Sequence, residues 1–192
     1  MPGSIQKTLR SKKGQSLIEL TLITPLMLLL VFGVVEVGSV ISTYLTVTHT
    51  TREGANLTSR GTDPNIALAA IIAAAAPTIR DDNRGQWRVI YSRIKQQIGT
   101  PCNPSCTYVI DPDPLNPGAI PGQIIRGNFS QASQLGNVGD TVTIPGVQDV
   151  GPNQVFHAIE VYYDYGPSVI TFIGNNINQT FYERSIFTNV SN

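Results

Sequence analysis

The sequence predicts an α+β protein, in which a long N-terminal transmembrane helix is followed by a small head with an antiparallel β-sheet. Three observations predict this class: a long apolar segment near the N-terminus, later segments that alternate apolar and polar residues, and clusters of Pro and Gly between them. We expect a basic cytoplasmic leader over residues 1–14, the apolar helix over 15–58 and an extracytoplasmic head over 59–192. A head of this size can bury one modest core.

The charges are distributed unevenly along the chain, although the formal net charge is zero. The first 14 residues hold four of the thirteen basic residues and no acidic residue. The remainder therefore has nine basic and thirteen acidic residues, a net charge of −4. Because no basic stripe follows the leader, we expect no nucleic-acid partner. The low share of charged residues, 14%, is typical of a neutral polar surface and favours an exported protein.

A membrane span is predicted over residues 17–40, where the only charged residues are Glu19 and Glu36. A helix of this length measures about 36 Å, and a bilayer core is about 30 Å thick. The basic residues lie just before the segment, so the positive-inside rule places Met1 in the cytoplasm and the head outside. The sequence therefore predicts a single-pass protein of the cytoplasmic membrane, with both glutamates near the interfaces.

Two other interpretations of this segment remain. It could be a cleaved secretory signal, with the small residues at 37–39 as the cleavage site. Against this, Glu36 lies beside that site, and the apolar pattern continues to Leu45 and Val47. It could also be a simple membrane anchor with no further role.

The entrance to the span carries a motif that suggests a further role. The basic leader ends at Gly14, and Glu19 follows five residues later. A carboxylate in an apolar helix is costly and needs a partner. Cleavage after Gly14 would give Gln15 a new α-amine, which could neutralise Glu19 of a neighbouring subunit and set the register between subunits. Alternatively, Glu19 simply reaches headgroup water, and these residues alone leave both interpretations open.

Pro25 lies within the apolar segment, where it removes one backbone donor and frees the carbonyl of Thr21. We expect a kink or a loosened turn at this point. The hydroxyls of Thr21 and Thr24 could satisfy the freed groups within a bilayer.

A family resemblance is carried by residues in three places. They are Gly14-Gln15-Ser16-Leu17-Ile18-Glu19, Pro25 within the apolar run, and Thr51-Arg52-Glu53-Gly54-Ala55. In this order they resemble the TadE/TadG-like family of minor pilins, over about residues 12–57. Residues 161–167 (VYYDYGP) also look like the tyrosine-rich strand and turn of these proteins.

The resemblance implies a structural pilin-like subunit of a tight-adherence (Flp-type) pilus, which moves from the membrane into a cell-surface filament. It implies cleavage by a prepilin peptidase between Gly14 and Gln15, and a role for Glu19 in subunit packing. The implied partners are other copies, other pilins, the peptidase, the inner membrane and the pilus assembly platform. A permanently anchored envelope protein with a binding head and a pseudopilin of a secretion machine remain as alternatives.

Within the head, Asp63 and Pro64 predict the start of a short apolar helix that ends before Pro77. Residues 88–98 show strand or helix character, and 111–122 predict a solvated Pro- and Gly-rich loop. We expect strands at 141–144 and 155–165, the second half-buried, with 180–190 pairing beside it.

Cys102 and Cys106 predict a disulfide that closes a small loop, because two cysteines lack the four ligands of a structural zinc site. His157 lies within a predicted strand, and we expect it to be packed or hydrogen-bonded rather than a ligand. The sequence has no Gly-rich phosphate loop and no nucleophile or zinc motif. We therefore expect no enzyme, no cofactor and no metal.

Overall fold

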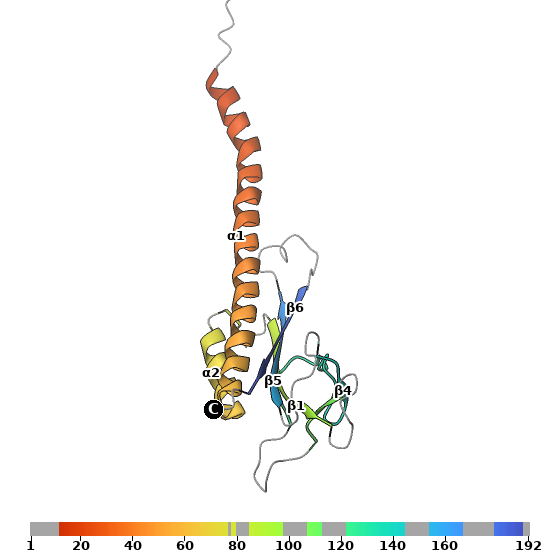
Figure 1. The fold of residues 1–192 in the computed structure, drawn as a ribbon. Helices are drawn as coiled ribbons and strands as arrows, with labels where there is room; N and C mark the ends of the chain where they lie inside the picture. Colours follow the sequence, from red (N-terminus) through yellow and green to blue (C-terminus); the bar gives the residue numbers. More distant parts are fainter. Residues whose placement is uncertain are drawn as a thin grey trace, which may run out of the picture. The chain divides into compact units, whose positions relative to one another are not determined.

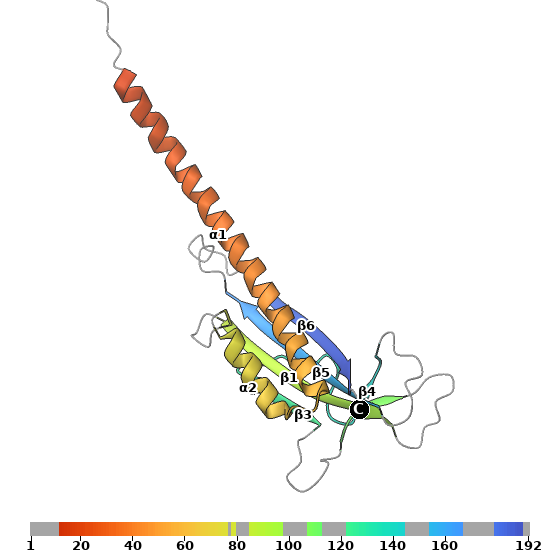
Figure 2. The same cartoon turned by 60° about the vertical axis from the view of Figure 1, so that its left-hand side comes forward.

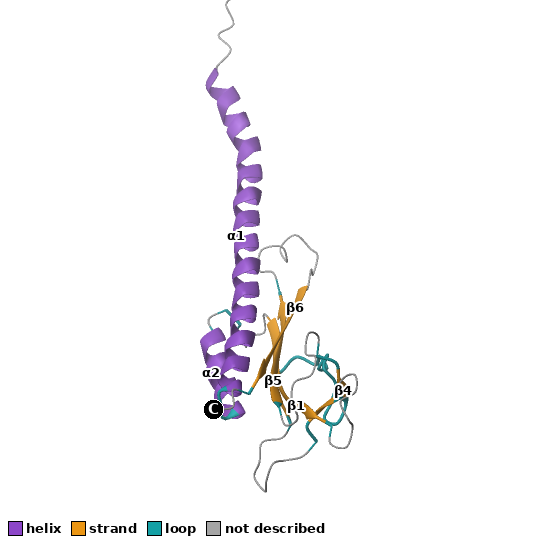
Figure 3. Ribbon diagram, in the orientation of Figure 1, coloured by secondary structure: helices purple, strands orange, loops and turns teal. Residues whose placement is uncertain are grey.

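The computed structural model describes residues 12–76, 78–79, 85–97, 107–112, 122–144, 154–166 and 179–189 (Figure 1). The chain divides into two compact units, residues 1–39 and 40–192. A long apolar helix is followed by a second short helix and an antiparallel sheet (Figure 3). The predicted α+β class is therefore confirmed.

The first helix, α1, spans Lys12–Ser59 and continues through Pro25. It begins three residues before the expected start at 15 and ends one residue after the expected end at 58. Gly61, with φ 85°, follows its end. The amide of Thr62 donates to the carbonyl of Leu57 at 3.2 Å, and the amide of Gly61 donates to Thr58 at 3.1 Å. These two bonds form a Schellman motif, which explains why the helix ends here.

The second helix, α2, spans Pro64–Ala75. The Asp63 side chain accepts a hydrogen bond from the amide of Asn65 at 2.7 Å, and Pro64 occupies the first turn. The N-cap predicted from the sequence is thus confirmed.

Within the described residues, six strands form one antiparallel sheet in the order β4-β2-β1-β5-β6, and β3 also pairs with β1. The strands are β1 (Gly85–Gln96), β2 (Tyr108–Ile110), β3 (Gln123–Gly127), β4 (Thr141–Val142), β5 (Val155–Tyr165) and β6 (Gln179–Thr188). Residues 88–98, which the sequence predicted as either strand or helix, lie mostly in the central strand β1. The predicted pairing of the last two strands is confirmed, with Tyr162 opposite Tyr182.

One face of the sheet is covered by α2 and the later turns of α1 (Figure 2). Odd-numbered residues of β1 and β5, such as Val89 and Val161, point to this face because side chains alternate along a strand. They pack with Val47 and Ala55 of α1 and with Leu68 of α2.

The opposite face of the sheet is buried as well, beneath the irregular segment 128–144. Phe129 of this segment packs with Ile90 and Tyr162, and Leu135 packs in a cluster with Phe156 and its neighbours. The expectation of a half-buried strand at 155–165 was therefore wrong. The covering segment has little regular structure, so no periodic pattern in the sequence signals it.

Candidate functional site: the apolar helix and its support in the head

The predicted cleavage point, Gly14–Gln15, lies in the first turn of α1. Glu19 lies on the next turn and is exposed. Gly14 and Gln15 therefore lie at the start of the helix, where the first four amides lack intrahelical partners.

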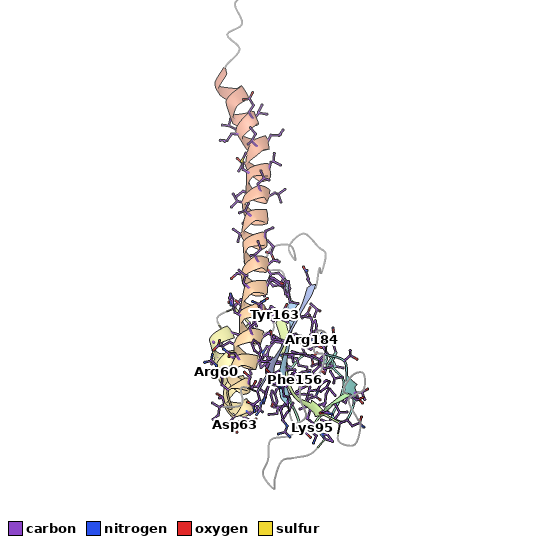
Figure 4. All side chains as sticks on the ribbon, viewed as in Figure 1. Arg60, Asp63, Lys95, Phe156, Tyr163 and Arg184 are labelled. Atoms are coloured by element: carbon purple, nitrogen blue, oxygen red, sulfur yellow. The ribbon has the colours of Figure 1, made fainter. Side chains whose placement is uncertain are left out.

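The following turns of α1 expose apolar side chains in all directions (Figure 4). Every side chain from Leu17 to Val35 is exposed, including Leu22 at 76% and Val34 at 74%. Among the described residues, this is the single helix that is long and apolar enough to cross a membrane. A helix that is apolar all round is stable only when lipid or other protein surrounds it.

The polar groups of this segment are held close to the helix. The hydroxyl of Thr21 donates to the carbonyl of Leu17, and that of Thr24 donates to Leu20, both at 2.7 Å. These carbonyls lie one turn back, so the hydroxyls do not reach the Thr21 carbonyl that Pro25 frees. The two hydroxyls were expected to bond to the groups that Pro25 frees, and this expectation was wrong. Both hydroxyls nevertheless have acceptors within the helix.

Glu36, the other acid of the segment, is only 4% exposed and takes part in a polar interaction. Its carboxylate is therefore absent from the exposed surface of α1. As a result, no charged side chain is exposed on this helix from Leu20 to Thr48.

The motif at 51–55 packs inside the second unit. Thr51 and Ala55 are fully buried, and the hydroxyl of Thr51 donates to the Val47 carbonyl at 2.7 Å. A Cβ placed on Gly54 would lie 2.7 Å from Cδ1 of Ile71 in α2. The small residues of the motif thus allow the two helices to approach closely, which gives them a packing role.

A buried carboxylate joins the sheet to segment 128–144, which covers the face of the sheet opposite the helices. Glu160 of β5 is fully buried and accepts a hydrogen bond from the Ser133 hydroxyl. It also accepts from the Gln134 amide at 3.0 Å, the Tyr182 hydroxyl at 3.0 Å and the Tyr162 hydroxyl at 3.3 Å. Burial and the nearby Glu160 charge raise the pKa of Tyr162 and of Tyr182, so both hydroxyls remain donors.

A second buried ionic group lies where β1, β2 and β3 meet. Asp111 forms ion pairs of 2.6 Å with Arg93 and with Lys95, and its amide donates to the Arg93 carbonyl at 2.8 Å. Asp111 is 4% exposed, so the expected solvated loop was wrong at its first residue. The remaining residues of that loop lie mostly outside the described residues.

His157 lies on the face of the sheet that the helices cover. Its Nδ1 atom is 3.0 Å from the Tyr91 hydroxyl. Burial, and then the charge of Arg93, lower the pKa of His157 to about 4, and burial raises the pKa of Tyr91 to about 12. His157 is thus a partly buried, hydrogen-bonded strand residue, and the predicted hydrogen bonding is confirmed.

No group of three His, Cys, Asp or Glu side chains that could hold a metal ion occurs in the part of the chain that the structure describes. Cys102 and Cys106, the predicted disulfide, lie outside the described residues.

Sequence reasoning missed the roles of Glu160 and Asp111. An acid in the middle of the apolar strand 155–165 was the available signal for the first.

The family model described as TadE-like protein matches residues 14–56 of the chain. No curated protein and no solved structure matches the chain. The matched region covers most of α1, including the cleavage motif, Pro25 and the packing motif at 51–55. The match confirms the resemblance found in the sequence and supports a pilin-like protein associated with tight-adherence pili. Residues 14–56 of this chain are therefore similar to TadE-like proteins.

Proposed function

We propose that this chain is a structural pilin-like subunit, which first inserts in the cytoplasmic membrane through α1 and then assembles into a tight-adherence pilus. The observation that carries the proposal is the exposed apolar surface of α1 from Leu17 to Val35, which directly follows the Gly14 motif. Burying each large apolar side chain contributes about 1.5–3 kcal/mol. Both a bilayer and a bundle of such helices provide this burial, so the same surface serves both stages.

In the membrane stage, the basic leader holds the N-terminus on the cytoplasmic side and the head lies outside. Prepilin peptidase then cuts between Gly14 and Gln15, which removes the four basic residues of the leader. Without those charges, the start of α1 can leave the membrane interface and enter an apolar bundle. Pro25 lacks an amide donor and allows the helix to bend during this transfer.

In the filament stage, Glu19 pairs with the α-amine of Gln15 of a neighbouring subunit. A carboxylate within an apolar bundle is penalised by several kcal/mol unless it is paired. This penalty makes one axial register between neighbours more favourable than the others. The pilus assembly platform and other pilins are the partners that this process requires.

The proposal is tested with Glu19→Ala in cells that produce the pilus, with Glu53→Ala as the matched control. Glu53 is an exposed glutamate on the same helix, in the second unit. The unaltered chain and Glu53→Ala should appear in sheared cell-surface material, each with the intact mass of a chain that begins at Gln15. Glu19→Ala should be cut and inserted normally but fall at least about tenfold in the sheared fraction, since 1.4 kcal/mol already corresponds to tenfold.

Normal amounts of Glu19→Ala in the filament would refute the pairing of Glu19 with the amine. Recovery of uncut chain in the membrane fraction alone would refute the assembly function and favour a permanently anchored envelope protein. Cut chain that never leaves the envelope would instead favour a secretion pseudopilus.

A further inference from the structure

The exposed apolar surface of α1 is longer than a bilayer core requires. Its exposed side chains are interrupted at the buried Glu36, and the first and last of the apolar ones are Leu17 and Leu45, the latter 49% exposed. These residues are 28 positions apart, and this distance along a helix is about 42 Å. The hydrocarbon core measures about 30 Å, whereas the bilayer with both headgroup layers measures about 40–45 Å. The surface therefore matches the full bilayer, including both interfacial layers.

The last part of this surface contains Ile41, Tyr44 and Leu45, which are 54%, 48% and 49% exposed. The opposite side of the helix is buried here, since Thr43 and Val47 are 4% and 0% exposed. The three side chains thus form a distinct apolar face, which we name the Tyr44 face. His49 and Arg52, the next exposed polar residues, lie beyond it.

Tyr44 is held in place by an aromatic neighbour. Its ring centroid lies 6.3 Å from that of Phe181 in β6, and Phe181 lies 6.0 Å from Tyr165 in β5. Phe181 is 8% exposed, so the outer side of Tyr44 is the part of this group that remains accessible. A tyrosine that is half exposed and packs on an aromatic neighbour suits the boundary between hydrocarbon and water.

We propose that the Tyr44 face is an interfacial anchor, which lies in the phospholipid headgroup layer on the side of the membrane opposite the leader. This inference rests on the proposed function, because it requires α1 to span the membrane before assembly. The anchor fixes the depth at which α1 leaves the bilayer on this side. Three apolar side chains hold this position weakly enough to release the subunit into a filament.

The test uses the full chain in vesicles of phosphatidylethanolamine and phosphatidylglycerol. The lipids carry bromine either near the headgroup or near the end of the acyl chain, and bromine quenches tryptophan fluorescence at short range. Three single variants are compared: Tyr44→Trp, Met27→Trp as a deep control and His49→Trp as a control beyond the anchor. The native Trp87 gives a background that the unaltered chain measures.

The added fluorescence of Tyr44→Trp should be quenched at least about twofold more by headgroup-proximal bromine than by deep bromine. Met27→Trp should show the reverse preference, and His49→Trp should be quenched by neither lipid. Quenching of Met27→Trp without quenching of Tyr44→Trp would overturn the anchor and leave the proposed function intact. Shielding of Tyr44→Trp that depends on the protein-to-lipid ratio would overturn it in favour of a second copy. Absence of quenching at Met27→Trp would overturn both.

Discussion

Replacing Glu160 tests whether one carboxylate fastens the irregular segment 128–144 to the outer face of the sheet. The Glu160→Ala variant removes the acceptor of four hydrogen bonds, from Ser133, Gln134, Tyr162 and Tyr182. Hydrogen bonds to charged groups contribute about 1.5–3 kcal/mol each, but such contributions do not add in a network. Tyr182 is only partly buried and can turn toward water, which limits the loss.

We therefore expect Glu160→Ala to lower the free energy of unfolding by about 3–5 kcal/mol, as for other broken buried networks. For a chain of this size, that corresponds to a fall of roughly 10 °C in the unfolding temperature. Glu160→Gln keeps an acceptor and the shape of the side chain, so its loss should be only about 1–2 kcal/mol. Ser133→Ala removes a single donor and should cost about 1 kcal/mol.

The assay is thermal unfolding of the full chain in detergent, followed by near-ultraviolet circular dichroism, together with hydrogen exchange of the Gln134 amide. Exchange at Gln134 should rise strongly in Glu160→Ala, whereas β1 should remain protected unless the whole sheet unfolds. A loss below about 1 kcal/mol with unchanged Gln134 protection would show that apolar packing of Phe129 and Leu135 holds the segment without the carboxylate.

Two further predictions concern the side of the sheet that the helices cover. Because the pKa of His157 is lowered from 6.5 to about 4, the unfolded chain binds a proton between these pH values that the folded chain does not. Stability should therefore fall as pH decreases from 6.5 to 4. His157→Gln should reduce this fall by roughly 1–2 kcal/mol, after allowance for the partial exposure of His157. Gly54→Val should destabilise the fold by about 1–3 kcal/mol through overpacking against Ile71, whereas Gly38→Val, with nothing within 4 Å of the added Cβ, should not.

Features that depend on residues close in sequence were predictable. The N-cap at Asp63 needs only the next two residues, and the strand at 155–165 shows its own alternation. The apolar helix was equally clear, because its length and composition alone meet the requirement of a bilayer.

Features that join distant segments were not predictable in the same way. Ser133 and Glu160 are 27 residues apart, and Tyr91 and His157 are 66 apart. Nothing in the sequence pattern of either segment identifies its partner. Segment 128–144, which covers the face of the sheet opposite the helices, shows no periodic pattern of apolar residues. Asp111 shows the same limit, since a Pro- and Gly-rich context predicts a solvated turn whereas Arg93 and Lys95 from another strand bury it.

The helix α1 meets two different requirements along one continuous element. Up to Val35 it must satisfy every backbone polar group internally and present only apolar side chains, so its threonine hydroxyls bond to carbonyls one turn back. After Val40 it must fit against a sheet and a second helix, so small residues such as Gly54 and Ala55 occupy the contact. The Tyr44 face lies where these requirements overlap, because one side of the helix already packs on the sheet while the other side is still apolar. A surface with this composition is suited to the membrane interface, and it explains why the exposed apolar run does not stop where the hydrocarbon core would end.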